Sequence, residues 1–188
     1  MTSAEEVAKV LDAIPEKHNR ILRFVGLLSR ASSSEIVIVG GSAIEIYTRG
    51  GYVSGDIDIR ADRESVQRVL RSWGFAHKGR LWVRADWGIA VDVVGDKYTG
   101  DLYRVTTLST PEATVQIAVV EDLFIKRLAA AKHWRVEEAL DEADLLWQGY
   151  HDTMDPAYLD RKAREYDVAD VLEAYRNRPR RRRRNGTR

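Results

Sequence analysis

The sequence predicts an α/β (α+β) protein in which a small mixed sheet is followed by a C-terminal helical bundle. Short runs rich in Val and Ile, bounded by Ser or Gly, are typical of buried strands, and they alternate with helically spaced apolar residues up to about residue 120. Beyond that point only the helical spacing continues. The chain has 188 residues, 44% of them hydrophobic, which is enough to bury a core of its own.

The elements expected before residue 120 interleave helices with strands. Two helices come first, and the strand after them leads through two glycines into a third helix. Asp62 is placed to cap a fourth helix, and residues 86–88 are expected to turn one strand into the next. In chain order, we expect helices near 4–14 and 21–28, a strand at 35–39, a helix at 42–47, a strand containing 56–59, a helix at 62–73, and strands at 75–77, 81–84, 89–94 and 114–120.

After residue 120 the pattern is entirely helical. Asp155 followed by Pro156 is a typical helix start, because proline fits the first helical position. We expect helices at 122–134, 136–147, 155–166 and 168–177. The chain is therefore expected to divide into a domain at 1–120, a helical subdomain at 121–177 and a disordered arginine-rich tail at 178–188.

Gly40 and Gly41 are the first residues that point to chemistry. They connect the strand expected at 35–39 to a helix expected to begin at Ser42. Glycine lets the backbone approach a ligand closely, and a helix N-terminus presents unpaired N–H groups and the positive end of its dipole. Such a turn favours a phosphate group.

Asp56 and Asp58 are the second feature. Alternation along a strand places both carboxylates on one face, while Ile57 and Ile59 point into the core. Like charges held this close repel each other, so a cation is needed to keep both ionised. Carboxylate oxygens select hard ions, which indicates Mg²⁺ or Mn²⁺.

Asp92 is the best candidate for a third ligand. It is the one acid in the apolar strand pattern at 89–94, and its burial without a partner would be costly. If its strand lies beside that of the other two aspartates, three carboxylates meet. Asp86, Asp96 and Asp101 are close in sequence and are the alternatives for this position.

These residues resemble the nucleotidyltransferase superfamily of the DNA polymerase β type. Its signature is a Gly-Gly or Gly-Ser turn, then Asp-x-Asp, then a third Asp on a later strand. The similarity covers roughly residues 35–94 and looks most like the stand-alone AbiEii/MenT-type toxin nucleotidyltransferases and their uncharacterised relatives. It implies a nucleotidyltransferase fold, with 1–120 as the catalytic domain. Besides the glycines and the aspartates, the matching residues are Ala43, Ile44, Tyr47 and Ser54.

The resemblance implies an NTP-dependent, two-metal enzyme. Two ions on Asp56, Asp58 and Asp92 would hold a nucleoside triphosphate. One ion would activate an acceptor hydroxyl, whose attack on the α-phosphate would transfer NMP and release pyrophosphate. The arginine-aspartate that follows the glycines in CCA-adding enzymes is absent, which disfavours that activity.

Five residues are implied as the nucleotide site. Backbone N–H groups at Gly41 and Ser42, with the Ser42 hydroxyl, would cradle the β- and γ-phosphates, and Gly40 belongs to the same turn. Ser54 either assists or caps the turn into its strand. On the helix expected to abut the triphosphate, Lys126 is preferred to Arg127 and Lys132, against the alternative of an ordinary surface lysine.

Composition indicates the cellular compartment of the protein. The chain has no Cys, which excludes disulfides, thiolate zinc sites and a cysteine nucleophile and indicates the cytoplasm. No apolar segment approaches transmembrane length, and residues 1–6 lack the pattern of a secretory signal. We therefore expect a cytoplasmic protein without a membrane partner.

Charge and resemblance together suggest the partners. Residues 178–188 contain seven arginines and no acid, so the remainder of the chain carries a formal charge of −6. Such a tail is either an RNA-contacting arm or a solubilising terminus. RNA, above all tRNA ends, is the favoured acceptor, with a protein hydroxyl or a small molecule as alternatives. The toxin-type resemblance implies a toxin–antitoxin pair with an antitoxin protein. The rival interpretation is a non-catalytic nucleotide- or RNA-binding module.

Overall fold

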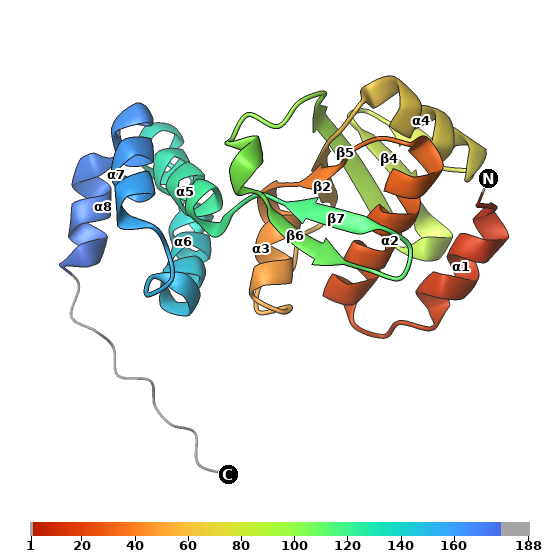
Figure 1. Cartoon of the computed structure of the whole chain (residues 1–188), viewed down its shortest axis with the longest axis horizontal. Helices are drawn as coiled ribbons and strands as arrows, with labels where there is room; N and C mark the ends of the chain where they lie inside the picture. Colours follow the sequence, from red (N-terminus) through yellow and green to blue (C-terminus); the bar gives the residue numbers. More distant parts are fainter. Residues whose placement is uncertain (1, 178–188) are drawn as a thin grey trace, which may run out of the picture.

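The computed structural model describes residues 2–177, and the tail predicted at 178–188 lies outside them. Within this range the predicted α/β class is confirmed: N-terminal helices, a seven-stranded mixed sheet and a C-terminal helical bundle follow one another. Figure 1 shows the helical bundle gathered at one end of the molecule, beside the sheet and its helices.

The helices of the N-terminal part are α1 (Ala4–Asp12), α2 (Lys17–Ser32), α3 (Gly40–Tyr47) and α4 (Arg63–Ser72). A capping box between Ser3 and Glu6 starts α1. The predicted cap of α4 is present, since Asp62 accepts the Ser65 N–H at 2.8 Å. The apolar side of α2, including Phe24, is buried, and this helix contacts α1, α3, α4 and the sheet.

The sheet has the strand order β3-β4-β5-β2-β1-β7-β6. The pairs β1/β7 and β2/β5 are parallel, and the other neighbours are antiparallel. Two short 3₁₀ helices, η1 (Ala85–Trp87) and η2 (Leu102–Arg104), lie in its connections. The strands are β1 (Val37–Ile38), β2 (Ile57–Arg60), β3 (Ala76–Lys78), β4 (Leu81–Arg84), β5 (Ile89–Gly95), β6 (Thr106–Ser109) and β7 (Thr114–Ile117).

Several predicted boundaries were wrong, among them those of α2, which spans Lys17–Ser32 and was expected near 21–28. The strand expected at 35–39 is only two residues long, because the chain turns at Gly40, where φ is +59°, and α3 begins there instead of at Ser42. The strand expected at 114–120 ends at Ile117, since Val119 already starts the next helix. The strand β6 was not predicted.

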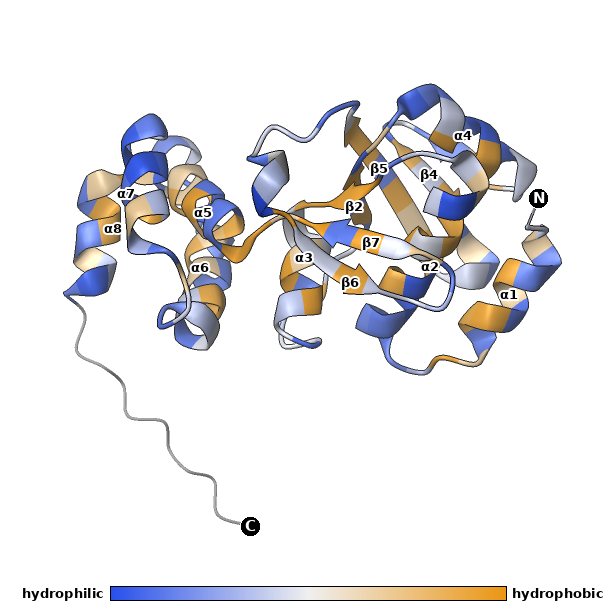
Figure 2. Cartoon of the chain, in the orientation of Figure 1, coloured by the Kyte–Doolittle hydropathy of each residue, from blue (hydrophilic) through white to orange (hydrophobic). Residues whose placement is uncertain are grey.

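The C-terminal bundle consists of α5 (Val120–Trp134), α6 (Glu138–Tyr150), α7 (Pro156–Glu165) and α8 (Ala169–Arg176). Buried apolar residues form one connected cluster from Val7 to Tyr175, so bundle and sheet share a core. Figure 2 shows the apolar colour along β2 and β5 and on parts of each bundle helix. The division at residue 120 falls where α5 begins and stays a prediction. Within residues 2–177, no helix has both the length and the apolarity needed to cross a membrane.

Asp122 joins the bundle to the loop after β5. Its carboxylate is 3% exposed and accepts two phenolic hydroxyls, from Tyr98 in that loop at 2.5 Å and from Tyr158 on α7 at 2.8 Å. The two neutral donors satisfy the oxygens of this buried carboxylate, whose charge also opposes the lowering of the pKa of the nearby Lys126 by burial. The loop and α7 are thereby held to the start of α5.

Candidate metal centre

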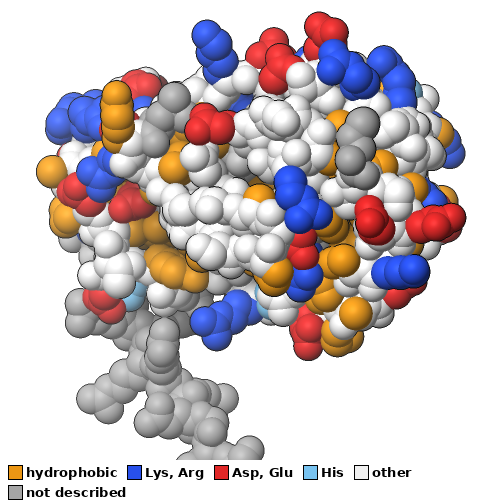
Figure 3. All heavy atoms as spheres, turned by 45° about the vertical axis from the view of Figure 1, so that its right-hand side comes forward, with side chains coloured by type: hydrophobic (Ala, Val, Ile, Leu, Met, Phe, Trp, Pro, Cys, Tyr) orange, Lys and Arg blue, Asp and Glu red, His pale blue; other side chains and the backbone are white. Residues whose placement is uncertain are grey.

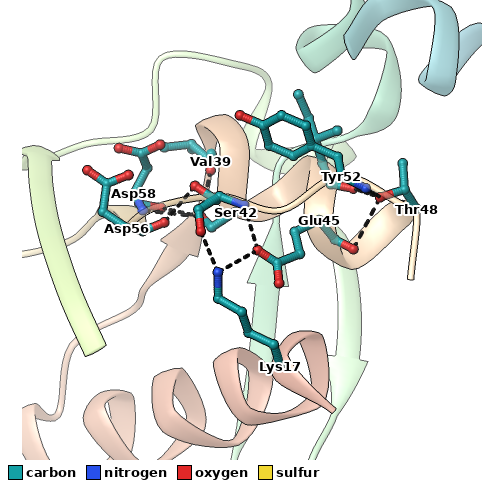
Figure 4. A network of polar contacts seen from close by, with 10 residues as sticks. Lys17, Val39, Ser42, Glu45, Thr48, Tyr52, Asp56 and Asp58 are labelled. Carbon is teal, nitrogen blue, oxygen red and sulfur yellow. Dashed lines mark hydrogen bonds and ion pairs between the residues drawn. The ribbon is translucent and has the colours of Figure 1, made fainter. Parts of the chain in front are cut away.

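Asp56, Asp58 and Asp92 come together on one face of the sheet. Asp58 on β2 lies directly opposite Asp92 in the parallel pairing with β5, and Asp56 precedes Asp58 by the two residues that return a strand to the same face. Each offers a carboxylate oxygen, and these oxygens lie within 4.8 Å of one another. The convergence predicted from strand alternation is confirmed. Figure 4 shows the Asp56 and Asp58 side chains next to each other.

The structure also decides between the candidates for the third carboxylate. Asp92 is buried in the triad, whereas Asp86 pairs with Arg84 and has a side chain that is 64% exposed. Asp96 forms an exposed ion pair with Arg63 at 3.5 Å, and Asp101 caps η2. These three aspartates therefore have other partners, and Asp92 alone among the four belongs to the cluster.

The triad carries an electrostatic cost. Burial, together with the charges of Asp56 and Asp92, raises the pKa of Asp58 to about 6 from its ordinary 3.8, against the opposing effects of the Gly41 N–H and Arg127. Three hard oxygen donors that repel one another are a suitable ligand set for Mg²⁺ or Mn²⁺. The residues present thus fit a divalent cation.

The glycine turn is built around Asp58. A Cβ on Gly40 would lie 2.1 Å from Asp58 Oδ2, and the positive φ at Gly40 also favours glycine. The next residue, Gly41, donates its backbone N–H to the same Oδ2 at 3.2 Å. Close backbone approach was predicted here for a phosphate, and in this structure it serves the Asp58 carboxylate. The phosphate-cradle roles of Gly40 and Gly41 stay predictions.

Ser42 and Ser54 both have partners inside the fold. The fully buried Ser42 hydroxyl donates to Val39 O at 3.0 Å and accepts the Asp58 N–H at 3.1 Å, so it ties α3 to β2. The Ser54 hydroxyl donates to Asp56 O at 2.8 Å, which is the geometry of a turn cap. A nucleotide-binding role for either serine stays a prediction.

Glu45 on α3 braces the loop that leads to Asp56. Its carboxylate is 1% exposed, accepts the Ser54 N–H at 2.8 Å and pairs with the Lys17 ammonium at 3.2 Å. Lys17 also donates to Ser54 O. Figure 4 shows Lys17 reaching from α2 to Glu45. This contact was not predicted, although an acid between two isoleucines of a short helix was a signal of burial.

A group of basic residues lies around Lys126 on α5. Lys126 is half-buried, which lowers its pKa. The charge of Asp122 opposes this shift, and the charges of Arg60, Lys162 and Arg127 add to it. Arg60 follows Asp58 by two residues, and Arg127 is the cation that acts on the Asp58 pKa. We call these residues the basic group: Arg60, Lys126, Arg127 and Lys162.

Arg127 is held by a partner on the next helix. Its Nε lies 2.5 Å from Glu142 Oε2, and Tyr52 hydrogen-bonds to the same carboxylate. Burial raises the pKa of Glu142, and the Arg127 charge opposes this. On the helix expected to abut the triphosphate, Arg127 is the residue whose charge acts on the triad, whereas Lys132 pairs with Asp170 at 2.8 Å. The nucleotide-binding role of Lys126 stays a prediction.

Arg80 is a second residue at the site that was not predicted. It lies in the turn between β3 and β4, with Nε 3.2 Å from Asp92 Oδ2 and Nη2 3.5 Å from Asp56 Oδ2. Both flanking strands were predicted, so an arginine at the tip of their hairpin was visible in the sequence. Its contact with the triad depends on strand pairing.

A cavity of about 210 Å³ adjoins the triad at Gly55, Asp56 and Ile57. Two basic residues of α2, Lys17 and Arg20, contribute to its lining. The other lining residues are Pro15, Ile21, Trp87, Gly88, Ile89 and Ala90.

Comparison with protein-family models found no match, and comparison with curated protein sequences found no significant match. A mixed sheet, C-terminal helices and an acidic triad that can hold a metal are consistent with a metal-dependent enzyme.

Proposed function

We propose that this protein is a metal-dependent nucleotidyltransferase that transfers NMP from an NTP to an acceptor hydroxyl and releases pyrophosphate. The observation that carries the proposal is the convergence of Asp56, Asp58 and Asp92 beside the Gly40–Gly41 start of α3. Bound divalent ions would supply Lewis-acid stabilisation of the phosphate charge at these carboxylates.

The residues of the chain supply binding and orientation. Arg127 of the basic group acts on the Asp58 carboxylate, and the positive charge of the group would bind the triphosphate. Within it, half-burial strengthens the interaction of Lys126 with an anion, because water screens the pair less. Gly40, Gly41, Ser42 and Ser54 would support the nucleotide from the α3 side.

RNA is the acceptor that we propose. The cavity at Asp56 has two cations in its lining, Lys17 and Arg20, which suit a phosphate of a single-stranded end. On the face shown in Figure 3, basic and acidic side chains are interspersed without a large area of one sign. The charge available to RNA is therefore proposed to come from the arginines at 178–188.

Removal of residues 178–188 tests the RNA proposal. The truncated protein is expected to keep its NTP affinity and to bind tRNA more weakly. If three or four arginines engage phosphates, the slope of log affinity against log salt becomes shallower by about 2 to 3 units. An unchanged affinity and slope would assign the tail a solubilising role. The antitoxin partner and the cytoplasmic location rest on sequence resemblance and composition.

The decisive experiment incubates the protein with each labelled NTP, Mg²⁺ and total cellular RNA, and identifies the molecule that becomes labelled. Asp92→Asn is the inactive control, and Asp96→Asn is the matched control for loss of a nearby exposed carboxylate. Label in RNA supports the full proposal, and label in protein or a small molecule changes the acceptor. Nucleotide binding without any transfer would favour the rival interpretation, a non-catalytic binding module.

A further inference from the structure

Arg80 bridges two of the three carboxylates of the candidate metal centre. The antiparallel pairing of β4 with β5 places Leu81 opposite Asp92, so the residue before Leu81 lies at the edge of the triad. From there the Arg80 guanidinium reaches Asp92 with Nε at 3.2 Å and Asp56 with Nη2 at 3.5 Å. One cation thus spans two ligand groups that a divalent ion would also use.

The Arg80 side chain is 74% exposed. Its ion pairs within residues 2–177 are those with the triad. An exposed ion pair is weak, because water screens it and the side chain loses freedom. The contact therefore offsets repulsion between the carboxylates without locking them.

The turn that carries Arg80 allows it to leave. The residue before it, Gly79, has a φ of +61° and open space around the position of a Cβ, and β3 is a short exposed strand. The interactions of the guanidinium are its ion pairs with Asp56 and Asp92, formed from a side chain that is mostly in solvent. Arg80 is held to Asp56 and Asp92 by charge.

We propose that Arg80 is a tethered counter-ion of the metal-free protein, which the incoming divalent cation displaces from Asp56 and Asp92. This inference rests on the proposed metal site. It implies that metal affinity is set by competition between the ion and the guanidinium, because both require the same carboxylate oxygens. Removal of Arg80 then strengthens metal binding, whereas loss of an ordinary supporting residue weakens it.

Titration with Mn²⁺ alone, followed by the electron paramagnetic resonance signal of free Mn²⁺, tests the proposal without substrate or turnover. The variants are Arg80→Ala, Arg80→Lys and Lys78→Ala in the full-length chain. Lys78 is the matched control, since it is an exposed cation of the same hairpin without a contact to the triad. Circular dichroism checks that each variant is folded. Asp92→Asn, which alters one of the three carboxylates, shows whether Mn²⁺ binds at the triad.

We expect Arg80→Ala to bind Mn²⁺ about 3- to 10-fold more tightly than the unaltered protein, since it removes one competing charge from an exposed contact. Lys78→Ala should change affinity less than 2-fold by the same screening argument. Arg80→Lys should bind Mn²⁺ with an affinity between those of Arg80→Ala and the unaltered protein, because an ammonium cannot span both carboxylates as a guanidinium does.

Three results would overturn the inference. Equal or weaker Mn²⁺ binding by Arg80→Ala would show that the guanidinium does not compete with the ion. Equal tightening in Lys78→Ala would assign the effect to the general field of the hairpin. If folded protein binds no Mn²⁺ with or without Arg80, the proposed metal site fails as well, and Asp92→Asn will then be indistinguishable from the unaltered protein.

Discussion

Asp58 lies directly opposite Asp92 in the parallel pairing of β2 with β5. Parallel neighbours are spaced by the hydrogen-bond ladder, so the separation of the two carboxylates is set by the backbone of the sheet. The flanking residues Ile57 and Ile59 are buried on the opposite face and hold the register. The two ligands are therefore placed before any ion arrives.

The first prediction concerns metal affinity. Asp56→Asn and Asp92→Asn should each weaken Mn²⁺ binding on the order of 10- to 100-fold, because ligand charge sets affinity for hard cations. The rate of nucleotidyl transfer should fall together with the Mn²⁺ affinity. The measurement is Mn²⁺ titration, and Asp96→Asn should match the unaltered protein. Full affinity in both triad variants would refute the metal centre.

The second prediction concerns pH and stability without metal. The pKa of Asp58 in the folded protein is about 6, above its ordinary 3.8, so folding loses stability as pH rises between these values. The loss is complete above about pH 6, and Asp58→Asn should remove it. We expect a gain of about 1 to 2 kcal/mol at pH 7.5, allowing for partial solvent screening.

Urea denaturation in the presence of a chelator measures this gain, which should shrink to less than about half at pH 4.5 by the same linkage. Asp96→Asn, which changes an exposed carboxylate, serves as the control. A gain of equal size at both pH values would show that the gain does not come from charge repulsion in the triad.

The third prediction compares two glycines with similar backbone angles. Gly40 has a φ of +59° and Gly79 a φ of +61°, but only at Gly40 would a Cβ meet the Asp58 carboxylate. Gly79→Ala should cost about 1 kcal/mol from its backbone alone. Gly40→Ala should cost about 2 to 4 kcal/mol and also weaken Mn²⁺ binding, because Asp58 must move.

Thermal unfolding of the two glycine variants, followed by Mn²⁺ titration at a temperature where both are folded, makes this comparison. If both variants lose the same stability and keep the same affinity, the contact between Gly40 and Asp58 has no role in placing the carboxylate.

The fourth prediction concerns the brace on α3. Glu45→Ala should cost about 1 to 3 kcal/mol, because the buried Ser54 N–H loses its acceptor. Glu45→Gln keeps an acceptor for the Ser54 N–H, and Lys17, which is 48% exposed, can be solvated when its ion pair is lost. The loss of stability should therefore be about 1 kcal/mol or less. Glu35→Ala, at an exposed position, is the control. Equal losses in Glu45→Ala and Glu45→Gln would contradict this account.

The fifth prediction concerns the two hydroxyls on Asp122. Tyr98→Phe and Tyr158→Phe should each cost about 1 kcal/mol, and the double variant should cost more than the sum. The reason is that the second loss leaves a buried carboxylate without a donor from either tyrosine. Urea denaturation of the four proteins measures the coupling. Tyr103, which is fully exposed, provides the control Tyr103→Phe. Additive losses would mean that Asp122 finds other partners.

Periodicity was sufficient for the fold class and for the carboxylates. Alternation placed Asp56 and Asp58 on one face, and an acid in an apolar strand indicated Asp92, because both signals are local. The strand β6 was missed, since Thr106–Ser109 is mostly polar and half-exposed. Such a strand is defined by its pairing with β7 and lacks a pattern of its own.

Contacts between distant segments also could not be predicted from the sequence. Glu45 meets Lys17 and Ser54 only when α2, α3 and the loop before β2 are assembled. Arg80 reaches the triad because the pairing of β4 with β5 brings its turn there. Helix and strand patterns specify which side chains share a face, and they do not specify which faces meet.

The contact between Gly40 and Asp58 has an evolutionary consequence. The carboxylate of one residue occupies the space that a side chain of the other would need. Positions 40 and 58 are therefore expected to covary among homologues: a residue with a Cβ at 40 requires a shorter or displaced residue at 58. A lineage that keeps the fold but abandons the acid at 58 is free to lose the glycine, whereas one that keeps the acid is not.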